Sequence, residues 1–440
     1  MSEWKKVKIG DVCKIVKGST GIASAEPGEY PLVVTAEERK SCSSYQFDCE
    51  AVCIPLVSSS GHGKKSLKNV HYQSGKFALG TILCAVVPNN PNELDARFLH
   101  QYLQFYKDKI LVPLMKGAAN VSLSMKDIAK VEIPLPSIEK QHELSELFVE
   151  TQKKYKELLE ESEKQKSYVK QLRQNILQDA IEGKLTEDWR KENPVVQGNP
   201  DFDAEALFEK IQEEKSHTDS ELLRNSKKKE KALPEITEDE KPFEIPEGWK
   251  WVRLGEIVNS ITDGDHLPPP KQATGIPFVV ISDISSGVIN FKGDRFVSED
   301  YFTKLPLEKI PLQNDILYTV TGSYGIPVFV TDFQFCVQRH IGIIKPKLYL
   351  KDFIYYCLKS PVCKKQADFV AWGVAVKTVP IKELRKFIIP LSPLAEQTEI
   401  VRVVESQLAK VDQLEKQITE RETLTKQLMQ SIMNDAFREG

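Results

Sequence analysis

The chain has 440 residues, of which 41% are apolar, with a formal net charge of −3 and a mean hydropathy of −0.34. This length predicts two or more domains, because a single hydrophobic core rarely extends over so many residues. The absence of any run of about 18 apolar residues, or of an apolar signal segment at the start, excludes a membrane-spanning class and favours a cytoplasmic protein. None of the eight cysteines forms a Cys-x-x-Cys pair, so we interpret them as reduced, packed thiols and expect no metal site.

The charge is distributed unevenly along the chain. Residues 1–140 carry 18 basic and 14 acidic side chains, and residues 249–395 carry 18 and 13, so their net charges are +4 and +5. The segments 141–248 and 396–440 have net charges of −9 and −3. Two basic regions joined by acidic segments hint at a polyanionic partner, although differences of this size also occur on ordinary solvated surfaces.

The second half of the chain repeats the first. Four segments recur in the same order: 3–12 at 248–257, 30–34 at 276–280, 98–103 at 353–358, and 126–135 at 382–391. The offset grows from 245 to 256 between the first and the last of these, and it then stays at 256 to the C-terminal end. The chain is therefore one unit written twice.

Each copy begins with a lobe of mixed character. Short runs rich in β-forming residues, such as 82–87 and 327–330, are separated by Gly, Ser and Asn turns. We therefore predict an α+β fold with two mixed α/β domains, lobe 1 at residues 1–136 and lobe 2 at residues 246–391.

A long helix is predicted after each lobe, at residues 137–183 and 392–440. The two segments hold no proline after the first helical turn and no internal glycine, and each is about 70 Å long as a helix. Selected residues follow a 4-3 rhythm, which is typical of a coiled-coil seam. The predicted seam of the first helix is Leu144, Phe148, Thr151, Tyr155, Leu158, Ser162, Gln165, Val169, Leu172 and Ile176. That of the second is Val404, Gln407, Val411, Leu414, Ile418, Arg421, Thr425, Leu428 and Ile432.

The segment 184–245 is interpreted as a charged linker, partly disordered, in which 203–215 could form one amphipathic helix. A linker of this length can span one long helix from end to end. It would allow the two helices to pack antiparallel, with one lobe at each far end.

Sequence motifs for catalysis are missing. An adenine methyltransferase needs an Asn-Pro-Pro-aromatic type of motif, and the nearest text is Asn90-Pro91-Asn92. Gly61-His62-Gly63 is a lone Gly-x-Gly without a nucleotide-binding context, and no P-loop is present. We therefore predict that the chain is not catalytic and holds no cofactor.

Polar loops that follow β-rich runs in the basic lobes are the candidate DNA-reading sites. Small residues let the backbone approach a phosphate, lysines neutralise it, and Arg and Gln suit the edges of guanine and adenine. The candidates in lobe 1 are Ser58, Ser59, Ser60, Gly61, His62, Lys64, Lys65, Lys68 and Asn120. Those in lobe 2 are Thr321, Gly322, Ser323, Tyr324, Gln338, Arg339, His340 and Lys377. The alternative interpretation is a set of ordinary solvated hairpins.

The duplicated order of lobe and helix resembles the specificity subunits of type I restriction–modification systems. The residues that carry the resemblance are Pro246-Glu247-Gly248-Trp249, the Ile-Pro-Leu pair followed by Gln141 and Gln397, and the helix end 180–186 with Trp189. It implies that each lobe is a target recognition domain for half of a bipartite, asymmetric DNA site, and that the helices form an antiparallel coiled coil as a spacer. It also implies two methyltransferase subunits and motor–nuclease subunits as partners, which would hold S-adenosylmethionine, ATP and Mg²⁺.

Two alternatives remain open from the sequence. The chain could be a duplicated coiled-coil adaptor whose lobes bind proteins. It could also be the specificity subunit of a related restriction family that cuts on both sides of its site.

Overall fold

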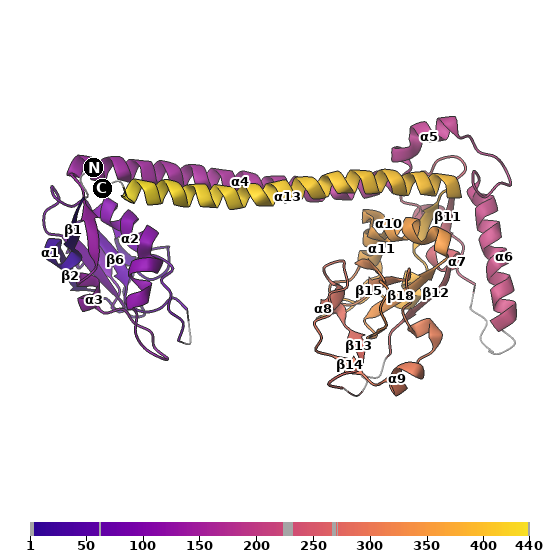
Figure 1. The fold of residues 1–440 in the computed structure, drawn as a ribbon, viewed down its shortest axis with the longest axis horizontal. Coiled ribbons are helices and arrows are strands. Elements are labelled where there is room, and N and C mark those ends of the chain that lie inside the picture. The colour runs from indigo at the N-terminus through magenta and orange to yellow at the C-terminus, as the bar shows by residue number, and fades with distance from the viewer. Residues whose placement is uncertain (1–3, 61–62, 223–231, 266–269, 271, 439–440) are drawn as a thin grey trace. The chain divides into compact units, whose positions relative to one another are not determined.

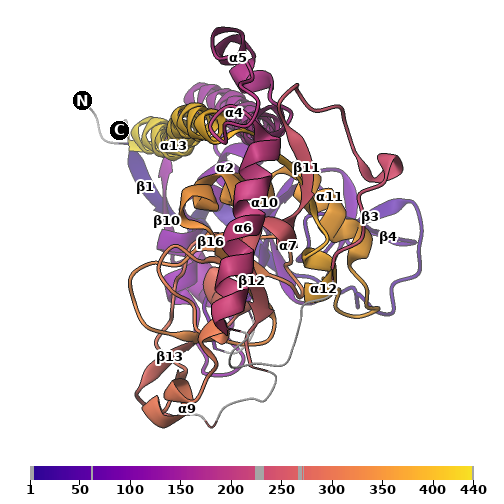
Figure 2. The ribbon, with the colours of Figure 1, turned by 90° about the vertical axis from the view of Figure 1, so that its right-hand side faces the viewer.

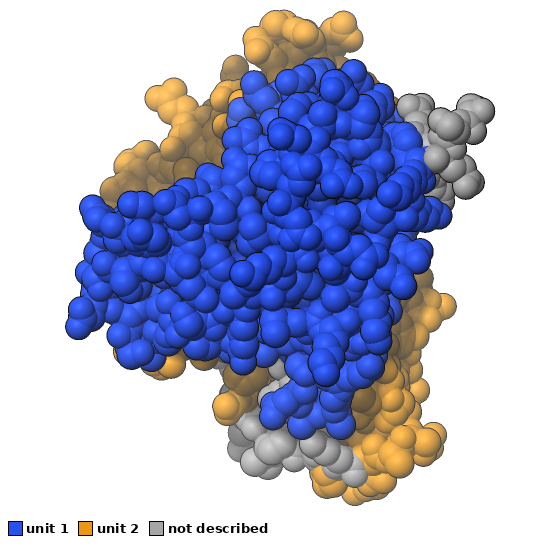
Figure 3. Space-filling model, turned by 90° about the vertical axis from the view of Figure 1, so that its left-hand side faces the viewer, with its two compact units in different colours: residues 1–164, 418–440 blue, residues 165–417 orange. Residues whose placement is uncertain are grey.

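A computed structural model describes residues 4–60, 63–222, 232–265, 270 and 272–438. The chain divides into two compact units, residues 1–164 with 418–440 and residues 165–417, which Figure 3 shows in blue and orange. Each unit holds one lobe and part of both long helices. Among the described residues, no helix combines the length and the apolar character needed to cross a membrane.

Lobe 1 contains three small sheets (Figure 1). The two-stranded sheet joins the start of the lobe to its end, and the two four-stranded sheets have the orders β2-β9-β6-β7 and β4-β3-β8-β5. The strands are β1 (Lys5–Lys8), β2 (Cys13–Lys17), β3 (Tyr30–Val33), β4 (Lys40–Cys42), β5 (Phe47–Asp48), β6 (Ala51–Pro55), β7 (His71–Gln73), β8 (Lys76–Leu79), β9 (Leu83–Pro88) and β10 (Glu132–Leu135). The helices are α1 (Ile9–Val12), α2 (Ala96–Ile110), the 3-10 turn Val112–Leu114 and α3 (Met125–Ala129).

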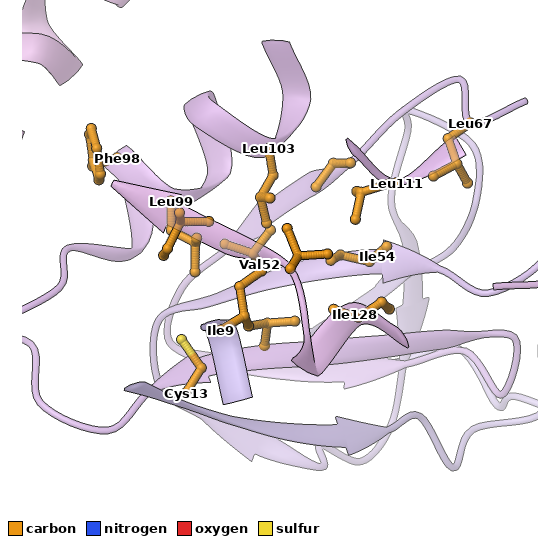
Figure 4. Packing of buried hydrophobic residues seen from close by; sticks show 14 of the residues in the cluster. Ile9, Cys13, Val52, Ile54, Leu67, Phe98, Leu99, Leu103, Leu111 and Ile128 are labelled. Carbon is orange, nitrogen blue, oxygen red and sulfur yellow. The ribbon is translucent and has the colours of Figure 1, made fainter. Parts of the chain in front are cut away.

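The core of lobe 1 lies between helix α2 and the sheet that contains β6 (Figure 4). Phe98, Leu99 and Leu103 recur at helical spacing on one face of α2 and are fully buried. They pack in one cluster with Val52 and Ile54, which lie two residues apart on β6 and so share a face of the strand. The apolar face of α2, with its helical period, thus packs on the apolar face of β6, with its period of two, to form the core of this lobe.

Lobe 2 repeats the strand pairing of lobe 1. Its sheets have the orders β11-β19, β12-β18-β15-β16 and β14-β13-β17. The strands are β11 (Lys250–Arg253), β12 (Val258–Asp263), β13 (Ile276–Val279), β14 (Phe296–Val297), β15 (Ile316–Thr319), β16 (Pro327–Phe329), β17 (Cys336–Val337), β18 (Ile341–Pro346) and β19 (Ile388–Leu391). The helices are α7 (Leu254–Ile257), α8 (Ile281–Ile284), α9 (Glu299–Thr303), α10 (Lys351–Lys359), α11 (Pro361–Val370) and α12 (Ile381–Leu384), with 3-10 turns at Leu307–Lys309 and Leu348–Leu350.

The register of the strands confirms the internal repeat. Lys5 lies opposite Leu135 in lobe 1, and Lys250 lies opposite Leu391 in lobe 2. The parallel pairing of named strands in each lobe is also equivalent, β3 with β8 and β13 with β17. The prediction of two mixed α/β lobes is correct.

The two long helices are α4 (Ile138–Ile181) and α13 (Leu394–Arg438). In the first unit the Phe148 ring of α4 lies 6.5 Å from the Phe437 ring of α13. In the second unit Arg173 of α4 forms an ion pair of 2.6 Å with Asp412 of α13. The two helices therefore pack against each other within each unit.

A buried glutamine secures the start of each long helix to its lobe. The Gln141 amide donates to the Pro136 carbonyl at 2.9 Å and accepts from the backbone N–H of Asp95 at 2.8 Å. Gln397 donates to the Ser392 carbonyl at 2.8 Å, which is the same contact 256 residues later. The repeated Ile-Pro-Leu and Gln motif thus encodes the junction of lobe and helix.

The predicted seam is wrong at four leucines. Leu158, Leu172, Leu414 and Leu428 are between 42% and 61% exposed. A straight helix of 3.6 residues per turn drifts against a strict 3.5-residue pattern, so the next residue can take the packing side. Leu159 is indeed more buried than Leu158. The buried members of the predicted seam are Leu144, Phe148, Ser162, Val169, Ile176, Val404, Val411 and Ile418. The half-buried members are Thr151, Tyr155, Gln165, Gln407, Thr425 and Ile432, and Arg421 is exposed.

The described part of the segment 184–245 packs on lobe 2, whereas the sequence suggested a linker that is partly disordered, and it contains the helix predicted at 203–215. It forms the 3-10 turn Lys184–Thr186, α5 (Glu187–Glu192), α6 (Ala204–Leu222) and the 3-10 turn Glu238–Glu240. Helix α6 lies beside α7 (Figure 2). Leu207 and Ile211 of α6 are fully buried, and Gln212 donates to the Glu256 carbonyl of α7 at 3.1 Å. The few apolar residues of this segment are enough to hold α6 on lobe 2, because they share one helical face.

The segment also does not run along the helix that precedes it. Its end returns to its start, because Pro246 lies so close to Gly183 that a Cβ there would come within 2.6 Å of the proline ring. The Arg253 guanidinium, which is buried, donates to the carbonyls of Pro234 and Glu235 and to the Glu240 carboxylate. Together these contacts close the segment into a loop on lobe 2.

Candidate nucleic-acid interface

Backbone hydrogen bonds bring three segments of lobe 1 together beyond the ends of its strands. The N–H of Leu56 donates to the Ile82 carbonyl at 2.8 Å, and the N–H of Leu123 donates to the Leu56 carbonyl at 2.8 Å. One step further, the N–H of Ser58 donates to the Val121 carbonyl at 3.0 Å. The loop after β6 therefore lies between the turn before β9 and the segment before α3. We call these three segments, with the backbone hydrogen bonds that join them, the ladder of lobe 1.

Lobe 2 has the same ladder. The N–H of Val320 donates to the His340 carbonyl at 3.1 Å, and the N–H of Val379 donates to the Val320 carbonyl at 2.8 Å. The N–H of Gly322 then donates to the Lys377 carbonyl at 2.9 Å. The predicted segments around Thr321, Gln338 and Lys377 are thus neighbours in space, although the sequence places them up to 56 residues apart.

One segment of each ladder is a tight hairpin, 116–122 in lobe 1 and 372–378 in lobe 2. Its two end residues exchange backbone hydrogen bonds, both of 2.8 Å in lobe 1 and of 3.1 and 2.9 Å in lobe 2. Gly117 and Gly373 have φ angles of 124° and 127°, and a Cβ on either would lie 2.3 Å from a carbonyl oxygen three residues later. Only glycine fits this backbone without strain, so the hairpin has the same backbone conformation in both lobes.

The predicted residues Asn120 and Lys377 lie on these hairpins. Both side chains are exposed. The hairpins lie beside the loop after β6 in lobe 1 and the loop after β15 in lobe 2. These two residues are weaker candidates by sequence than the serine and threonine loops, because a glycine followed by a polar residue is common in ordinary turns.

The serines of lobe 1 shape their loop from within. The Ser58 hydroxyl donates to the Lys64 carbonyl at 2.6 Å and accepts from the N–H of Ser60 at 3.3 Å. The Ser59 hydroxyl accepts from the N–H of Lys68 at 2.9 Å. These hydroxyls therefore fix the loop conformation, and the approach of the loop backbone to a phosphate stays a prediction.

The lysines of the same loop remain available to a ligand. Lys64, Lys65 and Lys68 are all exposed. Three ammonium groups on a loop held by internal hydrogen bonds form a positive surface suited to phosphates. The other two predicted members of the loop, Gly61 and His62, lie outside the described residues.

The Thr321–Tyr324 loop of lobe 2 is held by its side chains. The hydroxyls of Thr321 and Thr378 lie 3.2 Å apart, which ties the loop to the hairpin. The Tyr324 phenol donates to the Asp368 carboxylate at 2.8 Å, and this hydrogen bond raises the pKa of Tyr324. Ser323 is exposed between these two anchored residues.

Gln338, Arg339 and His340 form the turn between β17 and β18. Arg339 is exposed, and its Nε donates to His340 Nε2 at 3.3 Å. Burial lowers the pKa of His340, and the neighbouring Arg339 charge lowers it further, so this ring is neutral at pH 7. The turn therefore presents one fixed cation and two neutral polar groups.

Sequence analysis missed the equivalent turn of lobe 1, Gly80–Ile82. Thr81 is exposed there and stands where Arg339 stands in lobe 2. The signal was weak because the turn has no charged residue. Aligning the ends of β8 and β17 would have revealed it.

Metal-ligand clusters and reactive thiols are two features that would suggest chemistry on a substrate. The described residues include no group of three or more His, Cys, Asp or Glu side chains placed to hold a metal ion. Seven of the eight free thiols are buried, and burial raises the pKa of Cys13, Cys84 and Cys363 to about 12. Thiols of this kind are inert as nucleophiles.

The chain matches the family model for the type I restriction modification DNA specificity domain twice, at residues 1–169 and 246–421. The type I restriction enzyme EcoDI specificity subunit of Escherichia coli is 26% identical over 444 residues, covering 99% of this chain and 88% of that protein. The MjaVIII specificity subunit of Methanocaldococcus jannaschii is 22% identical, covering 99% and 93%.

Two solved structures have a similar fold. A chain from a study of complex assembly and conformational transition of the type I R-M system aligns with a TM-score of 0.62 at 19% identity, covering 100% of this chain and 98% of that one. The HsdS subunit from Thermoanaerobacter tengcongensis aligns with a TM-score of 0.52 at 18% identity, covering 99% and 97%. The chain therefore belongs to the family of type I restriction modification DNA specificity domains.

Proposed function

We propose that this chain selects the DNA site of a type I restriction–modification enzyme, with each lobe reading one half of a bipartite, asymmetric duplex sequence. The observation that supports this most is the three-segment ladder, which has the same backbone hydrogen bonds in both lobes and different side chains. Two domains that recognise different half-sites need the same backbone framework and different side chains on their loops.

The two interfaces differ in chemistry. Lobe 1 offers three exposed lysines on a loop shaped by serines, which suits phosphate contacts. Lobe 2 offers Arg339 and Gln338, whose side chains can form bidentate hydrogen bonds with guanine and adenine. Two different half-sites follow from this difference.

The long helices would act as the spacer between the half-sites. In the second unit, Arg173 of α4 pairs with Asp412, and Thr186, in the turn after α4, pairs with Glu396. Along α4 the residue number therefore rises while that of its partner on α13 falls. This order is the one expected of an antiparallel coiled coil. The length of such a pair, rather than any base contact, would set the number of unspecified base pairs.

Catalysis would belong to partner subunits. The sequence has neither an Asn-Pro-Pro-aromatic motif nor a P-loop. Two methyltransferase subunits with S-adenosylmethionine, and motor–nuclease subunits with ATP and Mg²⁺, would dock on this chain.

The test is co-expression with the methyltransferase partner in a methylation-free host, followed by sequencing that detects methyladenine. The proposal expects one bipartite motif with different half-sites and a fixed gap. A continuous motif, or no methylation by a complex that assembles, would contradict it.

A further inference from the structure

The hairpin 372–378 of lobe 2, called here the apolar hairpin, exposes hydrophobic side chains. Trp372 is 68% exposed, Val376 is 56% exposed, and Val374 at the tip is fully exposed. Among the five tryptophans, all of which are described, Trp372 alone is exposed. Single exposed apolar residues are ordinary on a protein surface, but three on one seven-residue hairpin form a patch of the kind that marks a binding site.

The apolar hairpin is held in place by the rest of the lobe. Trp372 and Thr378 exchange two backbone hydrogen bonds, and Gly373 closes the turn against the Val376 carbonyl. The Lys377 carbonyl accepts a hydrogen bond from the loop after β15. The apolar side chains are therefore presented on a fixed backbone, and their exposure is not the result of a frayed end.

Its neighbours identify the surface to which it belongs. The Thr321 hydroxyl meets the hairpin at Thr378, and Lys377 extends an exposed ammonium group from the hairpin itself. Through Val320 the ladder continues to the turn that carries Arg339. The apolar patch is thus continuous with the polar and basic segments that we assign to the DNA half-site.

The equivalent hairpin of lobe 1 has the same backbone without the patch. Ala118 stands where Val374 stands, Asn120 replaces Val376, and Lys116 replaces Trp372. Lys116 is exposed and forms an ion pair of 3.2 Å with Asp127. The backbone of this hairpin therefore does not require the apolar side chains.

Resting on the proposed function above, we propose that the apolar hairpin reads thymine in the lobe 2 half-site, with Val374 and Trp372 in contact with 5-methyl groups in the major groove. The thymine methyl is the one apolar group that bases display in that groove. A basic rim from Lys377 and Arg339 would hold the adjoining phosphates or guanine while the tip removes the methyl from water. The hairpin is thus a specificity-determining element for A·T pairs.

The test replaces each thymine of the lobe 2 half-site by uracil, which removes the methyl group alone. Duplex binding is measured with the assembled complex for the native chain, Val374→Ala and Trp372→Ala. The native complex should lose about fourfold in affinity at a contacted position, as expected for one buried methyl. Val374→Ala should bind the native duplex more weakly and respond little to uracil at that position.

The control variant is Val288→Ala, another exposed valine of lobe 2 outside the ladder segments, which should keep the full uracil response. If the native complex binds its site specifically and tolerates uracil at every thymine, the inference is overturned and the proposed function stands. If Val374→Ala loses affinity but keeps the full uracil response, the tip acts as a wedge between bases, which also overturns the inference. Loss of subunit assembly in Val374→Ala would make the patch a protein-docking surface instead. A native complex without sequence-specific binding would contradict the proposed function itself.

Discussion

The indole of Trp249 donates a hydrogen bond of 2.7 Å to the carboxylate of Glu396, 147 residues later in the chain. Trp249 precedes the first strand of lobe 2, and Glu396 lies in the first turn of α13. Thr186 and Arg190, from the segment after α4, bind the other oxygen of the same carboxylate at 2.7 and 2.5 Å. One buried side chain therefore joins lobe 2, the start of α13 and the end of α4.

Glu396→Ala should destabilise the second unit by about 3 kcal/mol, because it leaves the Arg190 guanidinium and the Trp249 indole without their buried acceptor. Urea unfolding followed by tryptophan fluorescence measures this. Glu399→Ala, one turn along the same helix, breaks an exposed pair with Arg402 and should cost less than about 1 kcal/mol. Equal costs for the two variants would show that the buried carboxylate does not join these elements.

Replacing Lys64, Lys65 and Lys68 by alanine should reduce the salt dependence of DNA binding by the assembled complex. The slope of log K against log salt should flatten by up to about 0.9 for each phosphate contact that is lost. The matched control replaces the three exposed lysines Lys126, Lys382 and Lys410, which lie outside the ladders. An unchanged slope in the first variant would show that the loop does not face DNA.

Gln338→Ala and Arg339→Ala should change the methylated motif in one half-site only, since the ladder of lobe 1 shares no segment with them. A bidentate base contact discriminates by about 1–3 kcal/mol, so the affected position should become degenerate. Sequencing for methyladenine in a host that carries each variant gives the result. A motif that keeps every base in both variants would exclude this turn as a reader.

The buried His71 should make lobe 1 less stable in mild acid. Burial and, to a smaller extent, the Arg39 charge together lower its pKa to about 4, whereas the unfolded value is near 6.5. The unfolded chain therefore binds the proton first, and stability is lost as the pH falls from about 6.5 towards 4. Between pH 7 and pH 5 the loss should be about 2 kcal/mol. His71→Gln should remove this dependence in urea unfolding, and an unchanged pH profile in that variant would contradict the assignment.

The repeat, the two lobes and the two long helices could be predicted because their signals are local. Hydrophobic period and a constant offset of 256 are visible without any knowledge of contacts. The residues that face the partner helix could not be predicted in full, since Leu158 and Leu159 both fit a 4-3 pattern and only the tertiary contacts select one of them. The ladder could not be predicted, because backbone hydrogen bonds such as that from Leu123 to Leu56 depend on segments far apart in sequence.

The roles of individual loop residues were also hidden from the sequence. Ser58 and Lys64 both suit a phosphate by composition, yet the serine hydroxyl is used within the loop while the lysine is exposed. Charged residues of the segment 184–245 suggested partial disorder outside the helix predicted at 203–215, but the buried Arg253 of lobe 2 donates to the Pro234 carbonyl and holds that part of the segment in place. In both cases the partner, rather than the residue type, decides the role.

If the two lobes read two half-sites, the length of the paired helices should set the separation of those half-sites. This is measured by the methylated motif of a host carrying the chain with four residues inserted after Ser162 of α4, in parallel with a one-residue insertion there. Four residues add about 6 Å of helix, and DNA advances about 3.4 Å per base pair. The gap should lengthen by one or two base pairs with both half-sites unchanged, while the single residue rotates the seam by about 100° and should abolish methylation. A four-residue insertion that leaves the gap as it was, or that alters a half-site, would show that helix length does not set the spacing.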